Sequence, residues 1–279
     1  VLGATGQQGG AVVRSLLDRG VAVRALVRRT DDPAAQRLAE QGVRVVRADT
    51  DDPGRLPEAL TDLRALFVMT VFASAGPAGE VIQGRRVAEA AAAAAVPHVV
   101  YSSVGGADRA SGVPHFESKW AIEQHLRQTG LPTSVIRPTF FMENFLQSMR
   151  PALENGGLVL RAPLGPTVPL QMIAVHDIGA VAAAVLIDPD IVASGSVEIA
   201  GDERTPEEVA NALGRRAGTP ARFEATPVDT ISDDDTRAMF AWLAAPPAYR
   251  ADLALTRRLH PAIQSFDGFL STSNFEIRR

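Results

Sequence analysis

The sequence has no cysteine and only two tyrosines, and each scarcity narrows the available chemistry. Without cysteine there is no disulfide and no thiol nucleophile, which fits a reducing compartment, so we expect a cytoplasmic protein. The net charge of −4 and the lack of a long basic run do not favour a nucleic-acid partner. No apolar stretch reaches the ~18 residues of a membrane span. We therefore expect neither direct nucleic-acid binding nor a membrane span.

The histidines do not suggest a metal site. There are five of them, and they lack the short spacing of metal ligands, so we expect no bound metal. His176 and Asp177 are adjacent in the chain. Because Asp177 precedes the apolar stretch "IGAVAAAVLI", we interpret it as the cap of a helix rather than as a ligand.

The first half of the chain alternates β-branched runs with helical stretches. The runs occupy residues 21–27, 43–46, 65–70, 98–103 and 133–138. Short connections between strands and helices predict a parallel sheet that is covered on both faces. The expected fold class is therefore α/β, with a doubly wound parallel sheet.

The second half has a different rhythm, with dense proline and glycine followed by mainly helical segments. We expect residues 1–149 to form a nucleotide-binding domain and residues 150–279 a smaller α/β domain on the substrate side, with some strands and helices interleaved. Thr205 precedes Pro206 and two acidic residues, which predicts a helix that Thr205 caps.

The opening segment "VLGATGQQGG" predicts a phosphate-binding turn between a strand and a helix. Gly3 permits a tight turn, Gly6 lets the backbone approach a pyrophosphate, and Gly9 lets the helix pack closely on the strand. The helix N-terminus offers amide donors to an anion. An ordinary strand–helix turn is the alternative, but the strand–helix alternation that follows favours dinucleotide binding.

The end of the second strand indicates which dinucleotide is preferred. A cofactor with a free ribose 2′-hydroxyl meets Asp or Glu at this point, whereas this chain has Arg28 and Arg29. A guanidinium group suits a 2′-phosphate, so we predict NADP(H) in preference to NAD(H). A solvated arginine pair is the alternative. Asp49, after the next strand, is placed either to accept from the adenine amino group or to cap a helix.

Several segments together resemble the NmrA-like family, whose members are atypical short-chain dehydrogenases/reductases. They are "GATGQQGG", "LVRR", "VVRADTDD", "YSSVGGAD", "HFESKWAIEQHLRQTGLPTSVIRPTFFMENF", "AVHDIGAVAAAVL" and "EIAGDERTPEEVANALGRRAG". The resemblance implies a Rossmann domain with an NADP- or NAD-binding crevice and a small α/β C-terminal domain. The family includes cofactor-sensing regulators and NADPH-dependent reductases of quinones and related acceptors.

The same resemblance implies a set of cofactor contacts along the glycine loop and at the ends of later strands. These are Gly3, Thr5, Gly6, Gln7, Gln8, Gly9, Arg28, Thr70, Lys119, Pro138, Thr139 and Phe140. Lys119 matches the lysine that holds the nicotinamide ribose and is a candidate catalytic residue. Ser102 or Ser103 could fill the superfamily's serine position, Ser102 beside the cofactor and Ser103 in proton transfer. The candidate lining of a substrate pocket is Phe141, Met142, Asn144, Trp242 and Tyr249.

The sequence departs from the superfamily pattern at residue 115. The usual catalytic tyrosine stands four residues before the lysine, but this chain has His115 there, and its tyrosines are Tyr101 and Tyr249. An imidazole exchanges protons near neutral pH, so His115 could substitute, although a neighbouring ammonium lowers its pKa. A histidine that only forms a local hydrogen bond is the alternative.

Two functions follow from these expectations. The first is an NADPH-dependent reductase of a small quinone- or enone-type acceptor, which needs orientation and a solvent proton rather than a built-in acid. The second is a redox sensor that binds cofactor without turnover and acts through a regulatory protein partner; the missing tyrosine favours it. Either role is compatible with an oligomer.

Overall fold

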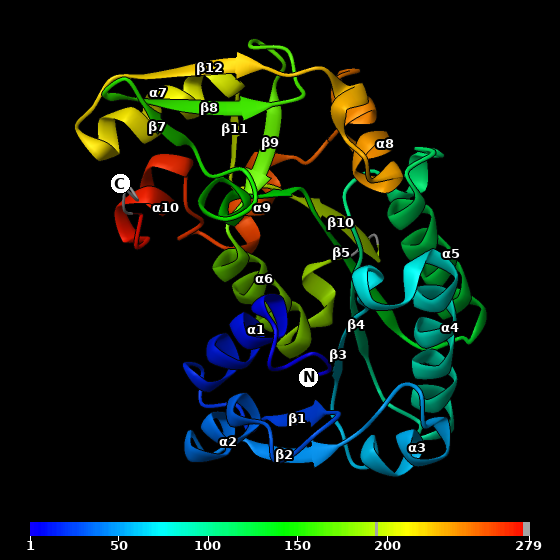
Figure 1. The fold of residues 1–279 in the computed structure, drawn as a ribbon. Coiled ribbons are helices and arrows are strands. Elements are labelled where there is room, and N and C mark those ends of the chain that lie inside the picture. Colours follow the sequence, from blue (N-terminus) through cyan, green and yellow to red (C-terminus); the bar gives the residue numbers. More distant parts are fainter. Residues whose placement is uncertain (193–194, 276–279) are drawn as a thin grey trace.

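The computed structural model describes residues 1–192 and 195–275 and shows a parallel sheet with helices on both faces (Figure 1). A second group of strands and helices lies above the carboxyl edge of that sheet. This arrangement confirms the α/β fold class with a doubly wound parallel sheet.

In the main sheet, the strand order reverses next to the first strand, residues 1–2. The members of this sheet, from one edge to the other, are β2 (Arg44–Arg47), β1 (Arg24–Val27), residues 1–2, β3 (Leu66–Met69), β4 (Val99–Ser102), β5 (Thr133–Pro138) and β10 (Ser196–Ile199). Thus β1 and β2 lie on one side of residues 1–2, and the strands from β3 onward lie on the other side. Leu2 joins the two parts, because it pairs in parallel with Leu26 and its N–H donates to the Phe67 carbonyl at 2.9 Å. All the strand pairs of this sheet are parallel.

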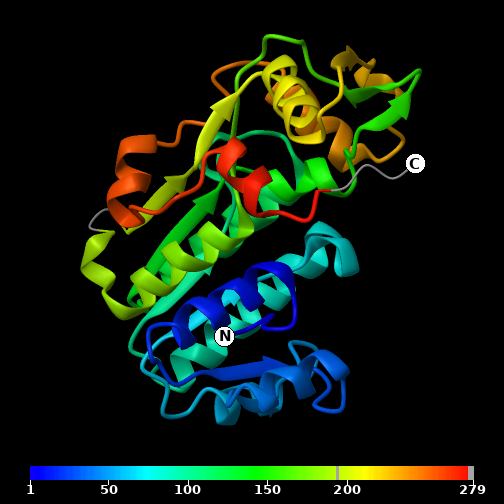
Figure 2. The same ribbon diagram turned by 90° about the vertical axis from the view of Figure 1, so that its left-hand side faces the viewer.

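Helices cover both faces of the sheet, which explains why β4 is buried at every position. One face carries α1 (Gln7–Leu17), α2 (Pro33–Glu40) and α6 (Val175–Ile187). The other carries α3 (Leu56–Ala59), α4 (Phe72–Ala93) and α5 (Pro114–Gln128). Figure 2 looks onto the face with α1 and α6, which lie side by side. Because α6 and β10 follow residue 150, both halves of the chain build this layer.

The first turn of α1 depends on two glycines. Gly3 has φ +70°, a conformation that side chains rarely adopt, and it makes the tight turn after the first strand. A Cβ added to Gly9 would lie 2.1 Å from the Gly3 carbonyl oxygen, so only glycine allows this approach of helix to strand. Both predicted roles are confirmed.

The remaining elements form the layer above the carboxyl edge. One small sheet contains β6 (Phe140–Phe141), β9 (Leu170–Ile173) and β11 (Asp202–Arg204), and the other β7 (Ala152–Glu154), β8 (Gly157–Ala162) and β12 (Ala221–Ala225). Their helices are α7 (Pro206–Ala217), α8 (Asp234–Leu243), α9 (Leu253–Leu259) and α10 (Phe266–Thr272). Short 3-10 helices lie at η1 (Pro53–Arg55), η2 (Ala107–Arg109), η3 (Met142–Leu146), η4 (Pro189–Ile191) and η5 (Val228–Thr230).

The two predicted helix caps differ in outcome. Thr205 caps α7 and forms a capping box with Glu208, as predicted. The prediction for Asp177 is wrong, because α6 begins at Val175 and Asp177 lies buried inside its first turn. The Val175 N–H donates instead to Glu143 Oε1 at 2.9 Å. The Asp177 carboxylate accepts from the Gln264 N–H at 2.9 Å and so fixes the segment before α10 to α6.

Within residues 1–192 and 195–275, no helix has both the length and the apolar character that a membrane crossing requires.

The contact between Gly9 and Gly3 gives a test of the fold. We expect Gly9→Ala to lower the free energy of unfolding by about 1–3 kcal/mol or more, because the new methyl group collides with backbone rather than with a movable side chain. Gly10→Ala, one residue along the same helix, is the matched control. A Cβ there lies 3.5 Å from its nearest neighbours, so up to about 1 kcal/mol of helix propensity should be gained. Urea unfolding followed by circular dichroism measures the free energy of unfolding of both variants. Equal effects of the two substitutions would contradict the close approach of Gly9 to the Gly3 carbonyl.

Candidate functional site

The residues predicted for the site gather at the carboxyl edge of the main sheet. Arg28 follows β1, Thr70 follows β3, Ser103 follows β4 and Thr139 follows β5. Because these strands are parallel, their carboxyl ends share one edge, and the N-terminus of α1 opens at the same edge. The strand order reverses between residues 1–2 and β3, which is where doubly wound sheets form their ligand crevice.

The glycine loop leaves the N-terminus of α1 open. Gly6 is the N-cap residue, and within the described chain no side chain caps this helix. Thr5, Gly6 and Gln7 are exposed. Gln8 is held in place, because its Oε1 accepts from the Ser102 hydroxyl at 2.7 Å. Backbone amides at an uncapped N-terminus and a fixed polar side chain beside it are the features of an anion site.

The two arginines after β1 are not equivalent. Arg29 lies 3.4 Å from Asp31 and is partly neutralised. Arg28 is exposed and forms no ion pair or hydrogen bond with the residues that the structure describes. Of the two arginines, Arg28 therefore has the free guanidinium group.

The carboxylate of Asp49 accepts from the Asp51 N–H at 3.0 Å, whereas the N-cap residue of η1 is Asp52.

A buried ion pair fixes Lys119 at this edge. Lys119 Nζ lies 2.8 Å from Oε1 of Glu80, whose carboxylate is fully buried. The same ammonium is 3.4 Å from the Thr70 carbonyl oxygen, at the end of β3. The ammonium also lies 3.5 Å from Thr70 Oγ1, so its three N–H donors face Glu80 and the two Thr70 oxygens. Lys119 thus holds a fixed positive charge, and its two contacts with Thr70 are long.

Hydroxyl groups complete the surroundings of Glu80. Thr70 Oγ1 donates to Oε1 at 2.8 Å and Ser118 Oγ donates to Oε2. Tyr101, fully buried, contacts Thr70 Oγ1 at 3.2 Å. Burial raises the pKa of Glu80, but the charge and hydrogen bond of Lys119 and the two hydroxyl donors outweigh it, so the pKa is lowered. Glu80 is ionised at neutral pH.

Glu80 was missing from the sequence prediction, although the sequence contains two signals for it. Glu80, Gly84, Val87 and Ala91 follow helical spacing and are all buried, so an acid lies on the buried face of α4. In addition, only one of the 28 basic residues is a lysine, Lys119, and the others are arginines. A chain that uses arginine everywhere else has an amine at this one position.

His115 lies one turn before Lys119, at the start of α5, and contacts α8. Its Nδ1 is 2.7 Å from Asp235 Oδ2, and its backbone N–H donates to Asp235 Oδ1 at 2.9 Å. The ring packs between Phe72 and Phe116, with centroids at 5.7 and 4.6 Å. Burial lowers the pKa of His115, Asp235 opposes that effect, and Lys119 adds to it. The residue is therefore mostly neutral at neutral pH.

Neither tyrosine can take the place that His115 occupies. Tyr101 is fully buried beside Thr70, and burial raises its pKa well above the ordinary value. Tyr249 is buried against Gly105 and Trp242, and burial raises its pKa too. Ser103 is different, since its buried hydroxyl has no partner among the described residues. The Ser102 hydroxyl, in contrast, donates to Gln8.

The residues predicted for a substrate pocket lie in varied surroundings. Phe140 and Met142 are buried in the core of the upper layer. Phe141 and Asn144 are half-buried, as is Trp242, which makes edge contacts with Phe116 and Tyr249. Pro138 ends β5, and the Thr139 hydroxyl donates to the Ile199 carbonyl at 3.2 Å. The part of Phe141, Met142, Asn144 and Trp242 in substrate binding stays a prediction, as does the part of Pro138, Thr139 and Phe140 in cofactor binding.

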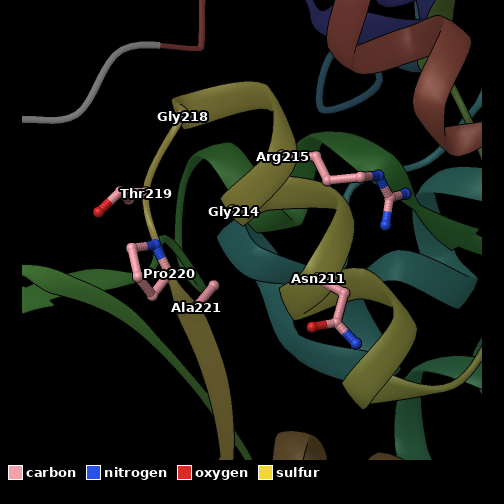
Figure 3. A pocket seen from close by; sticks show the side chains of 7 residues that line it. All are labelled: Asn211, Gly214, Arg215, Gly218, Thr219, Pro220 and Ala221. Atoms are coloured by element: carbon pink, nitrogen blue, oxygen red, sulfur yellow. The ribbon is translucent and has the colours of Figure 1, made fainter.

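Two hollows lie outside this edge and do not form a convergent site. One of about 510 Å³ lies at the end of α7 (Figure 3). There, Arg215 and Thr219 point in opposite directions, and Arg215 is paired with Asp267 at 2.9 Å. The other, of about 390 Å³, lies between η3, the start of α6 and α10. It contains Glu143, whose pKa is raised by burial.

The comparison with known proteins agrees with the edge geometry. The family model of the NmrA-like family matches residues 1–259. The chain belongs to this family. It is 34% identical over 235 residues to (4-alkanoyl-5-oxo-2,5-dihydrofuran-3-yl)methyl phosphate reductase of Streptomyces griseus, covering 82% of this chain and 77% of the relative.

Two solved structures with bound nicotinamide cofactors share the fold of this NmrA-like chain. An NADPH-dependent quinone oxidoreductase from Escherichia coli, complexed with NADPH, has a TM-score of 0.80, 25% identity and 97% coverage of both chains. Nmra, a negative transcriptional regulator in complex with NAD, has a TM-score of 0.83 and 19% identity, with coverage of 97% of this chain and 93% of that one. The expected family and fold are confirmed.

The Glu80–Lys119 pair predicts an unusual response to mutation. Lys119→Met leaves a buried carboxylate without its cation, so we expect the free energy of unfolding to fall by about 3–5 kcal/mol at neutral pH. Adding Glu80→Gln in the same chain should restore most of that loss, because the amide is neutral and can still bond to Ser118 or Thr70. Urea denaturation of the wild type, both single variants and the double variant measures the coupling.

The sign of the pH dependence follows from the lowered pKa of Glu80. The ionised carboxylate stabilises the fold above its ordinary pKa of 4.5, and this contribution is lost as the pH falls through the lowered value. The difference in the free energy of unfolding between the wild type and the double variant should therefore become smaller below about pH 4.5. A coupled pair would be contradicted if the losses of free energy of unfolding in the two single variants added up to the loss in the double variant. It would also be contradicted if the difference between the wild type and the double variant did not change with pH.

Proposed function

We propose that this protein is an NADPH-dependent reductase of a small quinone- or enone-type acceptor. The observation that supports it is the convergence, on one edge of a doubly wound sheet, of an uncapped helix N-terminus and the fixed ammonium of Lys119. An anion site and a fixed cation on one edge of the sheet suit a dinucleotide, which has phosphates in its middle and ribose hydroxyls toward its reactive ring.

The residues present fit such a cofactor. The Gly3–Gly9 turn presents backbone without side chains, and Arg28 has no protein partner to displace. The α1 amides would hold the pyrophosphate, Arg28 the 2′-phosphate, and Lys119 a ribose hydroxyl in exchange for one of its long contacts with Thr70. Ser103 offers its unpartnered hydroxyl farther along the same edge. NADPH, when bound, supplies the hydride for the reduction; the protein supplies orientation, charge and protons.

The class of acceptor is inferred from the proton donors that the site lacks. With both tyrosines buried, the reaction has to proceed without a phenolic acid. Quinones and enones meet this condition, because their reduced forms tolerate a transient negative charge until a proton arrives. The Streptomyces relative is named for a 5-oxo-2,5-dihydrofuran, and the Escherichia coli neighbour for quinones; both names are consistent with this class. We further propose a cytoplasmic location, where NADPH is available.

A cofactor sensor is the second candidate, and the enclosure of both tyrosines favours it. Nmra, which shares the fold, is named a transcriptional regulator. A sensor would bind cofactor and present its occupancy to a protein partner without turnover.

The two candidates are separated by measuring NADPH oxidation with panels of quinones, enones and aldehydes, together with cofactor affinity by calorimetry. A reductase gives saturable turnover with at least one acceptor and a reduced product by mass spectrometry. Saturable binding without turnover in any panel would favour the sensor, and absence of binding would overturn both.

Cofactor preference gives a sharper prediction. Arg28→Ala should weaken NADPH binding by about 1.5–3 kcal/mol, or one to two powers of ten, because it removes a charge-assisted contact to the 2′-phosphate. NADH binding should change little. Arg29→Ala is the matched control, since Arg29 is already paired with Asp31, and its effect should be less than threefold. Titration with both cofactors decides; equal affinities in the wild type would contradict the role of Arg28.

A further inference from the structure

Asp235 contacts His115 with both of its carboxylate oxygens. It lies in α8, 120 residues farther along the chain. One oxygen accepts the His115 backbone N–H at 2.9 Å, and the other lies 2.7 Å from Nδ1 of the ring. The two side chains are 19% and 14% exposed, so solvent screens this contact only weakly. The first contact alone would suffice to cap α5, whose N-cap residue Val113 has no side-chain cap bond.

The second contact favours one tautomer of the ring. A ring nitrogen and a carboxylate oxygen at 2.7 Å would repel each other if both presented lone pairs, so the Asp235 charge favours a proton on Nδ1, although the contact does not have the angle of a good N–H···O hydrogen bond. In the neutral ring the other nitrogen, Nε2, then has the lone pair. A carboxylate that fixes a histidine in this way is the arrangement that orients catalytic imidazoles in hydrolases.

The free nitrogen of the ring reaches solvent. Nδ1 is shielded, whereas Nε2 is accessible and has no partner among the described residues. Phe72, which follows β3, and Phe116 hold the ring on its sides. His115 and Lys119 are four residues apart in α5, so both lie on the same helical face. Nε2 is therefore presented beside the fixed ammonium, at the edge where the proposed cofactor binds.

We propose that His115 and Asp235 form a proton-transfer dyad for the acceptor, in which His115 is the proton donor and Asp235 is a positioning residue. This inference rests on the proposed function and refines its substrate class. The acceptor gains two electrons as hydride from NADPH, which leaves as NADP⁺, and its carbonyl oxygen becomes an enolate. The Nε2–H bond of the imidazolium then breaks as an O–H bond forms, and solvent reprotonates the ring.

The dyad favours acceptors whose reduction leaves a basic oxygen. An enolate is more basic than a hydroquinone anion, so its formation is accelerated more by a proton donor close by, whereas a hydroquinone anion is stable enough to leave and take its proton from water. An α,β-unsaturated carbonyl compound is thus the acceptor class that uses this donor.

The charged groups around His115 determine its pH dependence. Asp235 faces it from α8, with Asp233 just before that helix, while Lys119 lies on its own helix and Glu80 on α4. Burial lowers the pKa of His115, and the two nearby charges of Lys119 and Glu80 act in opposite senses. Imidazolium is therefore scarce at neutral pH, and reduction of an enone should accelerate as the pH falls.

Asp235→Asn is the variant that separates positioning from capping. Its amide oxygen can still accept the His115 backbone N–H, but its NH₂ group faces Nδ1 and favours the opposite tautomer. We expect kcat for an enone to fall about 10²-fold and to lose its rise at acid pH. The Kd for NADPH should be unchanged, and quinone turnover should fall less than tenfold. Asp252→Asn, which alters only the cap of α9, is the matched control and should leave all these values unchanged.

Nitrogen-15 NMR of the imidazole rings gives a readout that does not depend on turnover. The His115 signals are assigned by their loss in His115→Gln. The wild type should show the Nδ1–H tautomer, and Asp235→Asn the Nε2–H tautomer. An Nε2–H tautomer in the wild type, or equal losses of enone and quinone turnover in Asp235→Asn, would overturn the dyad. Absence of wild-type turnover with every acceptor, alongside the expected tautomers, would instead show that the proposed reductase function has failed.

Discussion

The buried carboxylate of Glu80 is the constraint on which the site depends. A fully buried anion needs a cation within contact, and Lys119 is the one lysine in the chain. The pair joins α4 to α5 and, through Thr70, to the end of β3. Because moving the ammonium away would strand a charge in the interior, Lys119 cannot swing freely toward solvent. Its position at the carboxyl edge is determined by α4 rather than by any ligand.

This neutralisation changes the electrostatic setting of His115. An unpaired ammonium one turn away would depress the pKa of the imidazole strongly, as the sequence suggested. In the structure the pKa is lowered, but burial is the largest cause, Asp235 opposes it, and the effect of Lys119 is set against that of Glu80. The chain therefore separates a fixed charge, which suits cofactor binding, from a titrating group, which suits proton transfer.

The parts of the structure that could be predicted from the sequence are those that local chemistry decides. The alternation of strands and helices, the Gly3–Gly9 turn and the Thr205 capping box depend on residues within ten positions of one another. The cap of α6 could not be predicted in this way, because Glu143 supplies it from 32 residues earlier in the chain.

The parts that sequence reasoning missed involve partners far apart in the chain. Glu80 and Lys119 are 39 residues apart and Asp235 is 120 residues from His115. Neither separation follows a local pattern. The single lysine and the acid on the buried face of α4 were nevertheless visible, and together they point to an ion pair. Nothing comparable marks Asp235, which follows two other aspartates and reads as one of several helix-start acids.

The replacement of a phenol by an imidazole has a consequence for the direction of reaction. A tyrosine acid stays protonated across the physiological range, whereas a buried imidazole loses its proton near or below neutral pH. In the proposed dyad, the protonated ring serves reduction, and the neutral ring presents the Nε2 lone pair, which could only accept a proton during oxidation. Acid conditions therefore favour the reductive direction for two reasons: they raise the fraction of imidazolium, and the reduction itself consumes a proton. At neutral pH the ring is mostly neutral and presents a base, so this dyad is equipped there to accept a proton from an alcohol, and its reductive role depends on the imidazolium fraction that grows as the pH falls.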